Sequence, residues 1–292
     1  MSIRNNEERF GAKYKNIDPP PPQIENQTTE NEEEREETPP LSFSLPTEFV
    51  DLPSKGIYYQ EDHPLHQQDT MEIRYMTARD EDILTSRSLL QKGVAIDRFL
   101  QNIIVNKHIK IDSLLTGDKN ALVVAARITG YGPEYKTKIS CPSCGEQSDY
   151  SFDLGELPHS EDDFPEGVEK TSHGTFIVTA PKTNVKVELK LLKSADEKTI
   201  LRTIKNKKKK NIPESPLTDQ LRMAIVSING RGEPNLINLF VNSLPAFDAR
   251  YLRDVYGKLM PNIDMKQNFM CPSCGAEQEL EVPLTSDFFW PK

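Results

Sequence analysis

The chain has 292 residues, with 36 Lys and Arg against 45 Asp and Glu, a formal net charge of −9 and 36% hydrophobic residues. This length fits one large domain or two small ones, and the net acidity argues against nucleic-acid binding through overall charge. No apolar run approaches the ~18 residues of a membrane span, and no hydrophobic segment follows Met1. We therefore expect neither a membrane span nor secretion, and the four cysteines do not predict a disulfide framework.

Residues 1–45 form an acidic and proline-rich segment. It contains Pro19-Pro-Pro-Pro22 and the run Glu30-Asn-Glu-Glu-Glu-Arg-Glu-Glu37. Such a segment buries too little apolar surface to offset the entropy lost on ordering. We expect a disordered or extended arm, and the alternative is an arm that becomes ordered along a partner protein.

The first structured stretch begins near Phe49. Thr77-Ala-Arg-Asp80 is typical of a capping box that opens a helix, and Gly93 is typical of a helix C-cap. Alternating and helical periodicities predict strands at 49–52, 57–59, 70–75, 136–139 and 150–154, and helices at 77–92, 94–106 and 118–130.

The second stretch repeats this order. Ser194-Ala-Asp-Glu197 predicts another capping box. The pattern predicts strands at 174–178, 185–189, 266–270 and 279–284, and helices at 194–209, 216–229, 234–243 and 246–260.

The repetition extends to individual residues. Glu72 to Leu84 aligns with Glu188 to Ile200, and the spans Ser113–Cys141 and Ser243–Cys271 are equally long. Chance similarity between amphipathic helices explains part of this, but shared order and spacing favour duplication. We expect an α+β fold in which two pseudo-duplicated strand/helix copies, residues 46–155 and 156–292, follow the arm.

Each copy ends in the same cysteine motif. Cys141-Pro-Ser-Cys-Gly145 and Cys271-Pro-Ser-Cys-Gly275 contain all four cysteines of the chain, and predicted strands flank both. Two such hairpins that meet at one tetrahedral site make a zinc ribbon, here split because 126 residues separate Cys144 from Cys271. We expect Cys141, Cys144, Cys271 and Cys274 to bind one structural Zn²⁺ per chain. Four thiolates leave no open position for a catalytic water.

Other interpretations of the cysteines are weaker. A thioredoxin-like redox pair lacks the surrounding βαβ pattern. Two small disulfides would need an oxidising compartment. Four ordinary buried cysteines would not need two matched motifs.

The remaining polar clusters predict no chemistry. We interpret Lys205–Lys210 as a solvated loop at a helix end. The alternative is a contact with the phosphate groups of nucleic acid or of acidic lipid. His63 and His66 are expected to be exposed, and the five histidines form no metal-spaced or nucleophile-paired set. Because no phosphate loop, nucleophile elbow or zincin motif is present, we expect no enzyme. The aromatics Phe288-Phe-Trp290 either pack on the body or anchor a partner.

Three segments carry a resemblance to a known family. They are Leu52-Pro-Ser-Lys-Gly-Ile-Tyr58, Ile73-Arg-Tyr-Met-Thr-Ala-Arg-Asp-Glu-Asp-Ile-Leu84, and Leu90-Gln-Lys-Gly93 with Ala95-Ile-Asp97. The chain resembles the baseplate hub proteins of T-even-type contractile-tailed bacteriophages, best over residues 46–155, suggestively over the second copy and not over the acidic arm. The second cysteine motif and the long arm depart from shorter family members.

The resemblance implies a late viral protein that builds the hub beneath the tail tube through contacts with other baseplate, hub and tail proteins. It would act as a permanent subunit of the virion tail baseplate, or as an assembly chaperone in the host cytoplasm that is absent from the mature virion. The resemblance assigns no catalytic residue to this chain. Hypotheses of other classes are a nucleic-acid-binding zinc-ribbon protein and, ranked last, a metalloenzyme.

Overall fold

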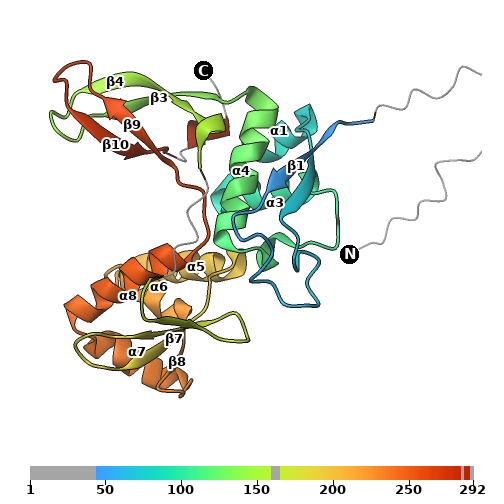
Figure 1. Ribbon diagram of the computed structural model, residues 1–292. Helices are drawn as coiled ribbons and strands as arrows, with labels where there is room; N and C mark the ends of the chain where they lie inside the picture. The colour runs from blue at the N-terminus through green and yellow to red at the C-terminus, as the bar shows by residue number, and fades with distance from the viewer. Residues whose placement is uncertain (1–43, 159–164, 284–285, 290–292) are drawn as a thin grey trace, which may run out of the picture. The chain divides into compact units, whose positions relative to one another are not determined.

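The computed structural model of the protein describes residues 44–158, 165–283 and 286–289. The acidic arm up to residue 43 lies outside the described residues, as do His159, the acidic triplet 161–163 and Trp290. The expectation of a disordered or extended arm therefore stays a prediction. Mixed helices and strands confirm the α+β class (Figure 1).

The first half opens with an antiparallel pair, β1 (Thr47–Asp51) and β2 (Thr70–Arg74). The strand predicted at 57–59 is wrong, because this segment folds as consecutive turns. Position 56 requires glycine for two reasons. Its backbone is left-handed, with φ +70, and a Cβ there would lie only 2.4 Å from Gln68 N. The turns bury Tyr59, whose hydroxyl donates to Asp118 Oδ2 at 2.6 Å.

Four helices follow: α1 (Ala78–Thr85), α2 (Arg87–Lys92), α3 (Ala95–Ile103) and α4 (Thr116–Tyr131). Thr77 caps α1 as predicted, and Asp80 Oδ2 accepts the N–H of Thr77 at 2.9 Å. The single helix predicted over 77–92 is wrong because Ser86, at ψ 109, breaks it into α1 and α2. Gly93 ends α2 at φ +71, as expected of a C-cap.

The second half contains an antiparallel sheet in the order β5 (Val168–Lys170), β6 (Phe176–Thr179), β7 (Lys186–Leu189) and β8 (Ile225–Ile228). Its helices are α5 (Ser194–Lys209), α6 (Pro216–Ala224), α7 (Pro234–Ser243) and α8 (Ala246–Leu259). The helix predicted over 216–229 is wrong beyond Ala224. Ile225, Ser227 and Ile228 instead pair with β7, with a register shift at Val226, because β-branched residues such as Ile and Val suit a half-buried strand.

Two hairpins contain the remaining described strands. They are β3 (Glu134–Ser140) with β4 (Gln147–Asp153), and β9 (Lys266–Met270) with β10 (Glu277–Glu281). Although more than a hundred residues separate them in sequence, they lie side by side (Figure 1). The Tyr150 hydroxyl donates to Asn268 O at 2.7 Å across this junction.

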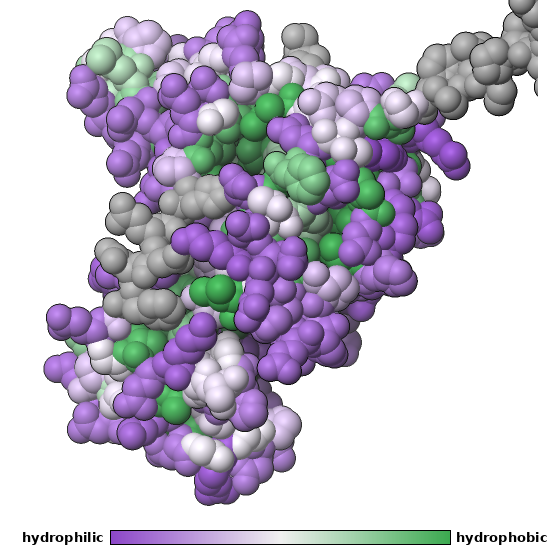
Figure 2. All heavy atoms as spheres, turned by 45° about the vertical axis from the view of Figure 1, so that its right-hand side comes forward, coloured by the Kyte–Doolittle hydropathy of each residue, from purple (hydrophilic) through white to green (hydrophobic). Residues whose placement is uncertain are grey.

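Backbone hydrogen bonds also join the two halves. Ser194 N–H donates to Leu114 O at 2.8 Å, and Thr116 N–H donates to Leu192 O at 3.1 Å. One apolar core runs through the described residues, from Val50 in β1 to the C-terminal aromatics. Most of the surface visible in Figure 2 is hydrophilic, with apolar side chains emerging between polar ones.

The end of the chain packs into this core. Phe288 and Phe289 are buried, with ring centroids 5.1 Å from Tyr135 and 5.5 Å from Phe99 respectively. Arg127, itself buried, donates from Nε to Phe288 O at 2.7 Å. Of the two alternatives, packing on the body is therefore the one that Phe288 and Phe289 adopt. Among the described helices, none combines the length and apolarity needed to cross a membrane.

Candidate metal centre

Each cysteine motif is a tight turn at the tip of a hairpin. In the first turn Gly145 N–H donates to Cys141 O at 2.8 Å, and in the second Gly275 N–H donates to Cys271 O at 2.9 Å. Both glycines have left-handed backbones, with φ +75 and +71. A residue with a Cβ would strain this conformation, which explains why glycine follows the second cysteine in both motifs.

The two turns bring all four sulfur atoms together. The Sγ atoms of Cys141, Cys144, Cys271 and Cys274 lie within 4.8 Å of one another, and all four are free thiols. Cys141 Sγ is 3.9 Å from Cys274 Sγ, and Cys144 Sγ is 3.8 Å from Cys271 Sγ. These separations far exceed the ~2.05 Å of a disulfide. They match the ~3.8 Å edge of a tetrahedron of sulfurs placed ~2.3 Å from a central metal.

The ionisation of these thiols favours a cation at their centre. The N–H groups of Cys144 and Ser143 point at Cys141 and lower the pKa of its thiol to about 6. The N–H of Glu146 acts likewise on Cys144, but the thiols of Cys274 and Cys141 outweigh it and raise the pKa of Cys144 to about 12. A cation at the centre would favour the deprotonated form of each sulfur, because metal ligation requires thiolates.

A further polar residue contacts the sulfur cluster. Gln278, in β10, places Nε2 3.8 Å from Cys141 Sγ and can donate to it. The sequence gives no signal for Gln278, because its contact joins residues 137 positions apart and depends on how the two hairpins pack. Cys141 and Cys271 are buried, while Cys144 and Cys274 are exposed. The centre is thus open to solvent on one side and supported by the hairpins on the other.

The other polar clusters singled out in the sequence lie away from the cysteines and have structural roles in their own helices. Lys205–Lys209 form the end of α5, as the helix predicted at 194–209 requires, and Lys210 is its C-cap, so the interpretation of this run as a loop is wrong. Lys207 is paired with Asp219 at 2.7 Å. Asp80 caps α1 and binds Arg74 at 2.7 Å, which explains the acidic first turn without a cation.

The two neighbouring histidines are half-buried, not exposed as expected, because they hold the turns after β1. His63 Nδ1 accepts the N–H of Leu65 at 3.2 Å, and burial lowers the pKa of His63. The neutral ring therefore carries its hydrogen on Nε2, which lies 2.8 Å from Ser113 Oγ and donates to it. In this arrangement His63 cannot accept the proton of Ser113, so the pair is not a nucleophile and its base.

The sequence model of the T4 bacteriophage base plate protein family matches residues 47–290. This match defines the class of protein, a component of a bacteriophage tail baseplate. The chain belongs to this family, and the resemblance seen in the first half extends through the second. No curated protein and no solved structure matches the chain.

Proposed function

We propose that the chain is a non-enzymatic structural or assembly component of the hub region of a contractile phage tail baseplate. The family match over residues 47–290 carries this proposal. Such a component acts through interfaces with other baseplate and tail proteins. A chaperone that assists hub assembly and leaves before maturation is the alternative, and the acidic arm and second cysteine motif suit a lasting role better.

The four-cysteine cluster is proposed to bind one structural Zn²⁺. Zinc suits four thiolates in tetrahedral geometry, and the spacing of the sulfurs supports this donor set. With all four positions filled by Cys141, Cys144, Cys271 and Cys274, the metal would have no place for a substrate. Its contribution is to folding, because metal binding stabilises the only state that holds the four sulfurs together.

The metal would clamp two distant parts of the chain. Each of the two close sulfur pairs joins the first motif to the second. Hydrogen bonds support the same junction, since Asp153 N–H donates to Gln267 Oε1 at 3.1 Å. A metal bound here would fix the β3–β4 hairpin against the β9–β10 hairpin.

Pseudo-duplication of residues 46–155 and 156–292 is supported by matched polar contacts. Arg74 is the last residue of β2 and binds Asp80 in the first turn of α1 at 2.7 Å. Lys190 follows β7 and binds Asp196 in the first turn of α5 at 2.9 Å. Asp196 Oδ2 also accepts the N–H of Lys193, which shows that Lys193 and not Ser194 occupies the N-cap of α5.

The baseplate role is tested by quantitative peptide mass spectrometry on purified mature particles and on infected-cell lysate. Recovery in particles at a fixed ratio to known tail proteins supports a permanent subunit. Abundance in lysate with absence from particles supports the assembly chaperone. Absence from both would overturn the proposal and leave a zinc-ribbon protein of another kind.

A further inference from the structure

Helix α5 is poorly covered by the rest of the protein. Of its 16 residues only Ser194 is buried, and Leu201 is 56% exposed. A hollow of about 310 Å³ lies beside Leu201, between the first and second halves of the chain. We call it the α5 groove; the larger apolar side chains of its lining are Leu90, Ile96, Val123, Leu201, Phe288 and Phe289.

Apolar side chains from three helices reach solvent around this groove. Leu90 of α2 is 47% exposed and Ile96 of α3 is 42% exposed, in addition to Leu201 of α5. Single exposed apolar residues need no explanation, but a group around one concave surface is typical of a binding site. The groove thus offers an apolar floor to which both halves contribute.

The charged residues inside the groove already neutralise one another. Asp97 Oδ1 is 2.9 Å from Lys119 Nζ, and Asp97 Oδ2 is 2.9 Å from Lys198 Nζ. Glu197 lies 3.5 Å from Lys119 Nζ. This network joins α3, α4 and α5, so the walls of the groove are held in place before any ligand arrives.

Unpaired cations continue from the groove along α5. A Cβ on Gly93, which lines the groove, would lie 3.3 Å from Lys205 Nζ, so this ammonium group sits at its mouth. Lys208 and Lys209 follow Lys205 by three and four positions and share its side of the helix. None of these three lysines forms an ion pair with a carboxylate among the described residues.

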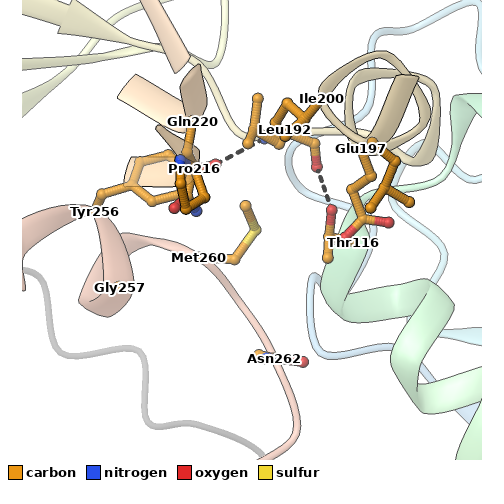
Figure 3. Close-up of a pocket in the computed structure, with 11 residues that line it drawn as sticks. Thr116, Leu192, Glu197, Ile200, Pro216, Gln220, Tyr256, Gly257, Met260 and Asn262 are labelled. Carbon is orange, nitrogen blue, oxygen red and sulfur yellow. Dashed lines mark hydrogen bonds between the residues drawn. The ribbon is translucent and has the colours of Figure 1, made fainter. Parts of the chain in front are cut away.

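Leu201 also borders a second hollow, which shares Glu197 with the α5 groove. This hollow has a volume of about 530 Å³ and is lined by Ile200, Pro216 and Met260 among others. Figure 3 shows its wall, where Leu192 accepts a hydrogen bond from Thr116 and donates one to the Tyr256 hydroxyl at 3.0 Å. Leu201 therefore stands as an apolar ridge between two concave surfaces.

We propose that the α5 groove binds an acidic segment of another protein, whose apolar side chain enters beside Leu201 while its carboxylates bind Lys205 and Lys208. Charge complementarity selects this partner, because the free charges at the groove are cationic and those within it are paired. This inference rests on the proposed role as a baseplate component, which acts by contacting other proteins. A nucleic acid would use the lysines but not the apolar floor, and no aromatic side chain interleaves with them for base stacking.

The test selects binders from a displayed random-peptide library on the full-length protein and measures their affinities. Two variants remove the proposed contacts, Leu201→Asn and Lys205→Glu with Lys208→Glu. Two matched controls make the same changes elsewhere, Leu239→Asn on α7, where the side chain is 66% exposed, and Lys186→Glu on β7 with Lys138→Glu on β3. A labelled oligo-dT strand is measured in parallel.

We expect enriched peptides that combine Asp or Glu with Leu, Ile or Phe. Their affinity should fall about tenfold or more on both groove variants and stay unchanged on both controls. Failure to enrich such peptides, or equal binding to variants and wild type, would overturn the proposal. Oligo-dT binding that is lost with the two lysines and retained in Leu201→Asn would assign the surface to nucleic acid. The assay needs no particle, so absence from virions would remove the baseplate role and leave this result standing.

Discussion

Asp118 and Asp248 are each the third residue of a long helix, and each carboxylate binds the turn that follows a strand. Asp118 accepts Ser54 N–H at 3.0 Å and Ser54 Oγ–H at 2.6 Å. Asp248 accepts Thr183 N–H at 3.0 Å and Thr183 Oγ–H at 2.8 Å. In both halves a buried carboxylate thus joins strand to helix, and that helix leads to a cysteine motif. This matched pair adds to the support for duplication.

The first prediction concerns these two carboxylates. Asp118→Asn should lower the free energy of unfolding by about 2–3 kcal/mol, because the buried Ser54 and Tyr59 donors lose their charged acceptor. Asp248→Asn should also destabilise the protein. Urea denaturation provides the measurement, with the exposed Asp149→Asn as the control. If Asp118→Asn unfolds at the same urea concentration as the control, the carboxylate is not a structural acceptor.

The second prediction concerns the metal clamp. Cys141→Ser and Cys271→Ser should each reduce the bound zinc well below one ion per chain and lower the melting temperature by about 5 °C or more. Ser273→Ala, which leaves all four thiols in place, is the matched control. Elemental analysis and thermal melting provide the measurements. Unchanged metal content and melting in both cysteine variants would contradict the clamp.

The third prediction concerns acid stability. Burial alone would raise the pKa of Asp80, but hydrogen bonds from Arg74, Thr77 and Asn102 outweigh it and hold the pKa at about 2. The ordinary value is 3.8, so between these values the unfolded state binds more protons than the folded state. The stability that Asp80 contributes is present above about pH 4 and is lost as the pH falls toward 2.

Asp80→Asn should therefore reduce the slope of unfolding free energy against pH below about pH 4, whereas exposed Asp82→Asn in the same helix should not. Urea titrations at a series of pH values measure this slope. An unchanged slope in Asp80→Asn would show that the ion pair with Arg74 forms no better in the folded chain than in the unfolded chain.

The fourth prediction concerns the C-terminal aromatics. Arg127 donates to three backbone carbonyls, Phe288 O at 2.7 Å, Gly132 O at 2.8 Å and Glu134 O at 3.1 Å. Lysine keeps the charge but cannot reproduce this fork of donors. Arg127→Lys should therefore speed hydrogen exchange in the peptide that contains Phe288 and Phe289. Exposed Arg250→Lys is the control, and equal exchange in both variants would contradict the anchoring role.

Much of the fold could be predicted because local signals and tertiary structure agree. The helix predicted at 194–209 and the strand at 266–270 match α5 and β9 in full. The helix has an acidic first turn at Asp196 and Glu197, and the strand leads directly into a cysteine motif. Local signals misled where long-range contacts decide, as at Ile225–Ile228, which continue a helical pattern in sequence but pair with β7 in the structure.

The cysteine cluster was predictable because two identical motifs specify identical local turns, whatever separates them. Gln278 and the α5 groove were not predicted, since each depends on how distant elements pack. Leu90, Ile96 and Leu201 are ordinary apolar residues in their own helices, and only the fold places them around one hollow. Lys205 likewise lies at the groove only because the fold brings its Nζ close to Gly93.

X-ray absorption spectroscopy at the zinc edge, on the full-length protein purified with its native metal, tests the central claim most directly. The clamp predicts one zinc per chain with four sulfur scatterers at ~2.3 Å and no nitrogen or oxygen neighbour. Nitrogen or oxygen in the first shell, or a folded chain without metal, would contradict it.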